Sequence, residues 1–164
     1  MTIERPRHFR DLTGDALVGA EGLRQNLRMI IGLLFDLRLL GGQAYGHLST
    51  ANSMPRMQLQ VDSIVQTARE ATDTIAERLR VLDASQCCSP NASMTIAPAP
   101  PPGEPSTEAV LDRIANRILT VVDIIGWVGD RLDTADSSTA DVLRAIGDVL
   151  QEQAWMLSAR ELKT

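Results

Sequence analysis

Aromatic residues, histidines and long apolar runs are scarce in this chain of 164 residues. Phe, Trp and Tyr together make up 3% of it, and it has two histidines. With so few aromatic side chains, a platform that stacks the bases of single-stranded nucleic acid is not expected. The longest apolar run, residues 29–35, stops at Asp36, far short of a membrane span. We therefore expect no membrane segment.

Cysteine is also sparse, and acidic residues outnumber basic ones. Cys87 and Cys88 are adjacent and lack the paired C-x-x-C elements of a zinc ribbon. We expect free thiols, with a strained vicinal disulfide as the alternative, and a cytoplasmic location. The net charge of −5 argues against a DNA-coating surface. Positive charge is enriched only at the start, at Arg5, Arg7 and Arg10, and these residues are expected to form a solvated arm. If they contact DNA, the binding should be weak.

Apolar residues at helical spacing are abundant. The pattern predicts a first helix from about Gly19 to Leu48 and a second from Pro55 to Asp83. A third helix should begin after a cap at Ser106 or Thr107, and a fourth after a turn at residues 136–139. The apolar faces in chain order are Leu23, Leu27, Ile30, Leu34 and Leu37; Leu59, Val61, Ile64, Val65, Ala68, Ile75, Leu79 and Leu82; Leu111, Ile114, Ile118, Val121, Val122, Ile125, Val128 and Leu132; Val142, Ile146, Val149, Leu150, Ala154 and Leu157.

No strand pattern competes with these helices, so the fold class is all-α, a ferritin-like four-helix bundle. We divide the chain into an N-terminal arm (residues 1–18) and the bundle (residues 19–164), with a proline-rich loop over residues 83–105. Such a loop is unusual in length and composition. It predicts a long connection that lets the second and third helices run the same way.

Three carboxylates on the second predicted helix share one face. At 100° per residue, Asp73 lies about 20° and Glu77 about 60° round from Asp62. Along the axis, however, Asp62 is about 16 Å from Asp73 and about 22 Å from Glu77. They cannot hold one ion within one chain, so a shared metal site requires two subunits. The alternative is a solvated helix face.

Motifs for other metal and catalytic chemistry are missing. A di-iron centre inside a bundle uses Glu-x-x-His motifs, and neither His8 nor His47 is preceded by Glu at that spacing. The sequence also lacks a Gly-rich phosphate loop and an H-E-x-x-H motif. An iron site within a single bundle is therefore disfavoured.

Several short motifs resemble those of the Dps family, the mini-ferritins of starved bacteria. The residues are Gln43-Ala44-Tyr45, the pair Gln58 and Asp62, and the run Asp73-Thr74-Ile75-Ala76-Glu77-Arg78. They look like the family patterns Q-A-H-W-N, H-x-x-x-D and D-x-x-A-E-R. The runs Ser138–Leu143 and Gln153–Leu157 resemble the family's last helix, so the resemblance covers about Leu23 to Leu162.

The resemblance implies a hollow homo-dodecamer that oxidises ferrous iron at two-fold subunit interfaces, stores the ferric mineral and protects against oxidative stress. One subunit would supply Asp62 and its neighbour Asp73 and Glu77. Both histidine positions of the family are substituted here, by Tyr45 and Gln58. Phenol and amide groups are poorer iron ligands than imidazole, so the implied ferroxidase would be weakened or altered.

Two questions stay open at the level of sequence. His47 either substitutes as a ligand or is a surface histidine at the end of the first helix. The chain is either an iron-binding Dps-like cage protein, a non-catalytic structural paralogue of that shell, or a helical-bundle interaction protein. We further expect Arg78 to form a structural ion pair, and Trp127, Trp155 and Met156 to pack in the core or an interface.

Overall fold

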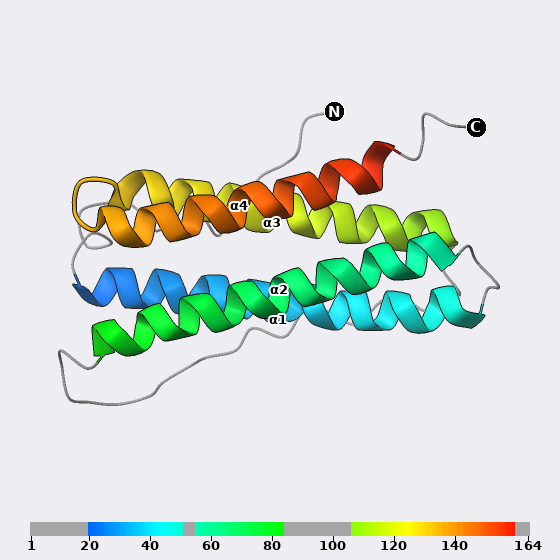
Figure 1. Cartoon of the computed structure of the whole chain (residues 1–164), viewed down its shortest axis with the longest axis horizontal. Coiled ribbons are helices and arrows are strands. Elements are labelled where there is room, and N and C mark those ends of the chain that lie inside the picture. Colours follow the sequence, from blue (N-terminus) through cyan, green and yellow to red (C-terminus); the bar gives the residue numbers. More distant parts are fainter. Residues whose placement is uncertain (1–19, 51–54, 84–105, 160–164) are drawn as a thin grey trace.

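The protein, seen here in a computed structural model, is described over residues 20–50, 55–83 and 106–159. These residues form a bundle of four long helices (Figure 1). In chain order the helices are α1 (Ala20–Thr50), α2 (Pro55–Asp83), α3 (Thr107–Leu132) and α4 (Ser137–Ser158). The predicted all-α four-helix bundle is confirmed.

The helices form two antiparallel hairpins, α1–α2 and α3–α4. α1 packs on α3, and α2 packs on α4. Because α2 ends and α3 begins at opposite ends of the bundle, these two helices run in the same direction (Figure 1). One long crossover of this kind gives the connectivity of ferritin-like bundles.

This arrangement gives the molecule two distinct ends. The α3–α4 turn end holds the start of α1, the end of α2 and the turn between α3 and α4. The α1–α2 turn end holds the end of α1, the starts of α2 and α3, and the end of α4 (Figure 1). Asp83, predicted to open the loop, is the last residue of α2. Arg5, Arg7, Arg10, Cys87 and Cys88 lie outside the described residues.

A continuous apolar core runs between the four helices. Most residues of the predicted faces are buried in it, including every one of the five predicted on the first helix. Two predicted positions are wrong: Leu59 is 70% exposed and Val149 is 47% exposed. Leu59 lies 200° round the helix from buried Val61, and Val149 lies 100° from buried Leu150, so neither shares the inward row.

Gly41 lets two helices approach closely, whereas Gly147 leaves room for ordinary contact. A Cβ atom at Gly41 of α1 would overlap the Cγ2 methyl of Val65 on α2, so the absence of a side chain is required there. At Gly147 of α4 a Cβ would lie 3.4 Å from the Cγ2 of Ile125 on α3. The neighbouring Gly42, by contrast, has open space where a Cβ would lie. Helix α1 continues through both glycines to Thr50.

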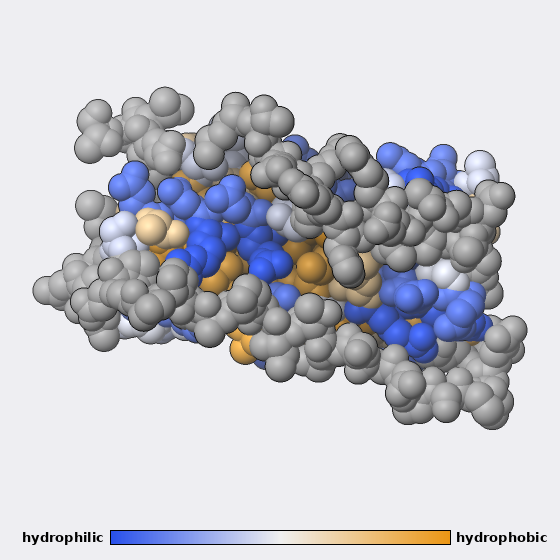
Figure 2. Space-filling model, turned by 180° about the vertical axis from the view of Figure 1, so that it is seen from behind, coloured by the Kyte–Doolittle hydropathy of each residue, from blue (hydrophilic) through white to orange (hydrophobic). Residues whose placement is uncertain are grey.

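The outer surface mixes polar and apolar areas. From the side opposite Figure 1, where α1 and α3 lie nearest the viewer, apolar surface appears between hydrophilic areas (Figure 2). Half-buried Leu33 and Leu40 of α1, and Leu119 and Val122 of α3, pack against the core. Among the described helices, none has a stretch long and apolar enough to cross a membrane.

Candidate metal-binding face and its support

The three predicted carboxylates all lie on the exposed side of α2. Asp62, Asp73 and Glu77 are each exposed to solvent. Because α2 is helical throughout, Asp62 is separated from Asp73 by about 16 Å along the axis. Within the described residues, no three His, Cys, Asp or Glu side chains come close enough to hold a metal ion.

Asp73 and Glu77 are the two of these carboxylates that a single ion could reach together. They are four residues apart on one helix, so their Cβ atoms lie about 6 Å apart. Glu77 forms an ion pair with Arg80, one turn further on. Both partners of that pair are largely exposed, so its contribution to stability is small. Arg80 contacts Oε2 of Glu77, so a cation that binds this oxygen competes with Arg80.

The residues at the two histidine positions lie at the α1–α2 turn end. The side chain of Tyr45 is 46% exposed on α1. The amide nitrogen of Gln58 donates a hydrogen bond to the carbonyl oxygen of Leu48 at 3.3 Å. This bond satisfies one of the carbonyls left over at the end of α1 and fixes the first turn of α2 against it. His47 is half-buried in the same turn of α1.

The six predicted ligands therefore form two groups. Gln58 and Asp62 are one turn apart on α2, near the end that also holds Tyr45 and His47. Asp73 and Glu77 lie towards the opposite end of α2 (Figure 1). The structure does not bring the two groups together in one chain.

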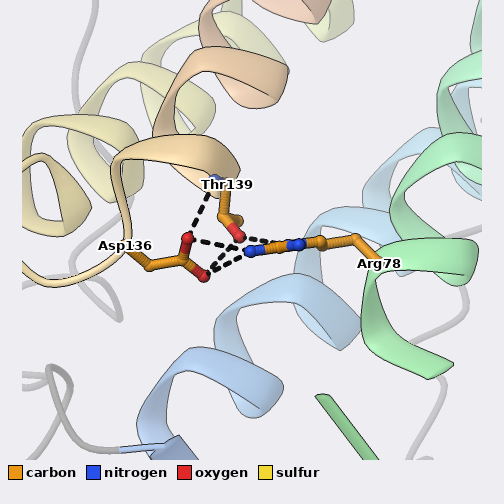
Figure 3. A network of polar contacts seen from close by, with 3 residues as sticks. All are labelled: Arg78, Asp136 and Thr139. Atoms are coloured by element: carbon orange, nitrogen blue, oxygen red, sulfur yellow. Dashed lines mark hydrogen bonds and ion pairs between the residues drawn. The ribbon is translucent and has the colours of Figure 1, made fainter. Parts of the chain in front are cut away.

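Arg78 ties the end of α2 to the start of α4 (Figure 3). Its Nη2 atom donates to both carboxylate oxygens of Asp136, at 2.9 and 3.0 Å, and its Nε donates to the hydroxyl of Thr139 at 2.6 Å. The side chains of Arg78 and Asp136 are 28% and 18% exposed, and Thr139 is buried. The prediction of a structural ion pair at Arg78 is confirmed.

Asp136 has a second role as the N-cap of α4. One oxygen accepts from the backbone N–H of Thr139 at 3.1 Å and the other from its hydroxyl at 2.6 Å. Burial opposes ionisation of Asp136, but the Thr139 bonds and the charge of Arg78 outweigh it and lower the pKa of this carboxyl. The sequence indicated a cap in this turn. The contact with Arg78 spans 58 residues and left no local signal.

The tryptophans divide between the two expected kinds of environment. Trp127 is half-buried against the core, and the guanidinium of Arg131 lies 4.0 Å from its ring centroid, which confirms a packing role. Trp155 is 71% exposed and Met156 is 37% exposed. Neither belongs to the core of the chain, so for these two only the interface role remains a prediction.

Comparison with known proteins does not assign the chain to a family. No protein-family model matches the sequence, and no curated protein matches it either.

Proposed function

We propose that this chain is a subunit of a Dps-like homo-oligomeric shell that binds and stores iron, with a weakened ferroxidase. The observation that carries the proposal is the pair of ligand groups on α2, exposed and too far apart for one chain to use together. Carboxylate oxygens suit ferrous and ferric ions. The motif resemblance and the ferritin-like connectivity support the same function. A cytoplasmic location and at most weak DNA binding belong to the proposal.

A two-fold contact between two copies would join the groups. If the α2 helices of two copies meet antiparallel, Asp62 of one lies beside Asp73 and Glu77 of the other, and the reverse holds by symmetry. The axis would then pass close to Ala68 and Arg69, halfway between the groups. Arg69 is exposed, as a residue beside such an axis must be.

This placement predicts a specific cross-link. In a chain carrying Cys87→Ser and Cys88→Ser, the change Arg69→Cys should give a disulfide-linked dimer on mild oxidation, because the two new thiols would face each other. The matched change Gln66→Cys, at an exposed position on the same face one turn away, should cross-link less, because its two thiols would be offset along the antiparallel helices. Equal cross-linking of both variants would contradict the antiparallel contact.

The size of the particle tests the assembly directly. Multi-angle light scattering should give a dodecamer, the particle that the motif resemblance implies. The two-fold contact alone closes at a dimer, so further contacts would join the pairs. A stable monomer or simple dimer would favour a helical-bundle interaction protein instead. A dodecamer that takes up no iron would favour the non-catalytic structural shell.

The non-catalytic shell is favoured by particular contacts. Tyr45 and Gln58 replace imidazole, the amide nitrogen of Gln58 is bonded to Leu48, and Glu77 is paired with Arg80. The double change Tyr45→His and Gln58→His should therefore raise the rate of ferrous iron oxidation well above the parent. Adding Glu77→Ala should abolish that gain. A double variant that assembles normally and oxidises iron no faster would contradict the assignment of these two positions.

A further inference from the structure

The end of α2 that carries Asp73 and Glu77 packs on the core through Ile75, Leu79 and Leu82, and Arg78 adds a polar contact to the start of α4. Arg78 follows Glu77 directly, and its guanidinium makes three hydrogen bonds to the start of α4 (Figure 3). Helix ends fray unless they are tied down, and Arg78 lies five residues before the last residue of α2. Ile75 and Leu79 keep this part of α2 packed on the core, and the Arg78 bonds further restrict the turn that carries Glu77.

The contact of Arg78 with Asp136 and Thr139 fixes the orientation of the guanidinium as well as pairing its charge. One Arg78 nitrogen, Nη2, donates to both oxygens of Asp136, while Thr139, itself 1% exposed, accepts from the Nε–H. Thr139 in turn donates its hydroxyl proton to Asp136. The three side chains thus form a closed ring of bonds, which restricts the rotation of Arg78 about its own axis.

We propose that Asp136 and Thr139 are positioning residues for iron binding: by holding Arg78, they fix the turn of α2 that presents Asp73 and Glu77. This proposal rests on the proposed function, because it assigns a role at the same metal-binding face. Neither residue touches the ion. Their effect passes through the backbone of α2, in the way that groups behind metal ligands set ligand orientation.

The test measures ferrous iron binding by anaerobic calorimetry at neutral pH on the full-length oligomer. Asp136→Asn keeps an N-cap, since Asn caps as well as Asp, but it removes the charge that holds Arg78. Thr139→Val keeps the shape and removes the hydroxyl, whereas Thr139→Ser keeps the hydroxyl. Circular dichroism selects a temperature at which all variants retain parental helix content.

Arg144→Gln is the matched control. Arg144 pairs with Asp133 at 2.6 Å and with Asp141 at 3.0 Å, so it joins the same turn to the same helix without contacting α2. We expect Asp136→Asn and Thr139→Val to weaken iron binding about 10-fold, the lower end of the range for groups that orient ligands. Thr139→Ser and Arg144→Gln should bind as the parent does.

Three results would overturn the proposal, and they are distinguishable. If Asp136→Asn and Thr139→Val lower the melting temperature but bind iron as the parent does, the ring of bonds serves stability alone and the proposed function stands. If Arg144→Gln weakens binding equally, the effect belongs to the whole turn. If the parent itself binds no ferrous iron, the proposed function fails and this role fails with it.

Discussion

The two ends of the bundle are held together by different chemistry. At the α3–α4 turn end, Arg78 makes a charged, three-bond contact with Asp136 and Thr139. At the α1–α2 turn end, the corresponding contact between α2 and α4 is a neutral bond of 3.2 Å from Gln153 to Ser63. Large apolar side chains, Leu59 and Trp155 among them, are exposed there.

The difference in polar contacts is accompanied by a difference in exposed apolar side chains, which are more numerous near the α1–α2 turn end. At the α3–α4 turn end, Arg78, Asp136 and Thr139 satisfy one another within one chain, while Val81 is the one large apolar side chain of the described residues near this end that is exposed, at 56%. The α1–α2 turn end exposes Tyr45, Leu59, Trp155 and Met156 to solvent. Exposed apolar side chains that gather at one place are typical of contact surfaces. In the proposed shell, this end would contribute to contacts between subunits.

The largest expected effect on stability comes from removing Asp136 at the α3–α4 turn end. Asp136→Ala removes the N-cap of α4 and the acceptor of two Arg78 bonds, so it should lower the free energy of unfolding by about 2 kcal/mol or more. Chemical denaturation of the variant measures this. Asp141→Ala, which removes an exposed partner of Arg144 at the same end, is the control and should cost far less. Equal losses would mean that the Arg78 contact has no special role.

A smaller effect is expected at Gly41 and Gly42, in the second half of α1. Gly41→Ala places a methyl group against Val65 and should destabilise the fold by about 1–3 kcal/mol. Gly42→Ala meets no atom and should stabilise it by about 1 kcal/mol through helix propensity. Thermal melts of the two variants should shift in opposite directions. Shifts of the same sign would contradict the close approach of α1 and α2.

Acid should weaken the contact between Asp136 and Arg78 at the α3–α4 turn end. The pKa of Asp136 is lowered in the folded chain below its ordinary value of 3.8, so its contribution is present above the unfolded pKa. That contribution is lost as the pH falls through the lower, folded pKa. Stability measured from about pH 5 downwards should therefore fall more steeply for the parent than for Asp136→Asn. Parallel curves would show that Asp136 titrates alike in both states.

The smallest effect on the fold is expected at the other end. Trp155→Gln removes a side chain that is 71% exposed, so the unfolding free energy of the chain should change by less than about 0.5 kcal/mol. If Trp155 contributes to a subunit contact, sedimentation should show weaker assembly at the same time. A large loss of stability in the dissociated chain would contradict the exposure described above.

Much of the fold follows from local pattern. The row Leu23, Leu27, Ile30, Leu34 and Leu37 repeats at helical spacing, and each of these residues is buried. The helical repeat itself places Leu59 on the far side of the helix from Val61, so its exposure follows from the sequence. It could not place Val149, because a residue at the edge of an apolar stripe is buried only if a neighbouring helix covers it. Whether a helix covers such a position depends on the packing angle between helices, which the pattern of one helix does not contain.

The candidate site was predicted only in part. Exposure of Asp62, Asp73 and Glu77 on one side of α2 follows from the helical repeat, and so does their separation. The tie of Arg78 to Asp136 does not, because it joins segments that are distant in sequence and meet only in the folded bundle. Likewise, nothing local indicated that Gln58 would bond the last turn of α1.

Subunit complementation tests the central claim, that two copies share one site, most directly. Asp62→Asn disables one half of the proposed site, and the pair Asp73→Asn with Glu77→Gln disables the other. Each variant alone should bind little ferrous iron. When both are expressed together, half of the two-fold contacts should be mixed, and each should carry one intact site, so about a quarter of the parental sites should return. No recovery in mixed particles would show that the carboxylates of α2 do not combine across a contact between subunits.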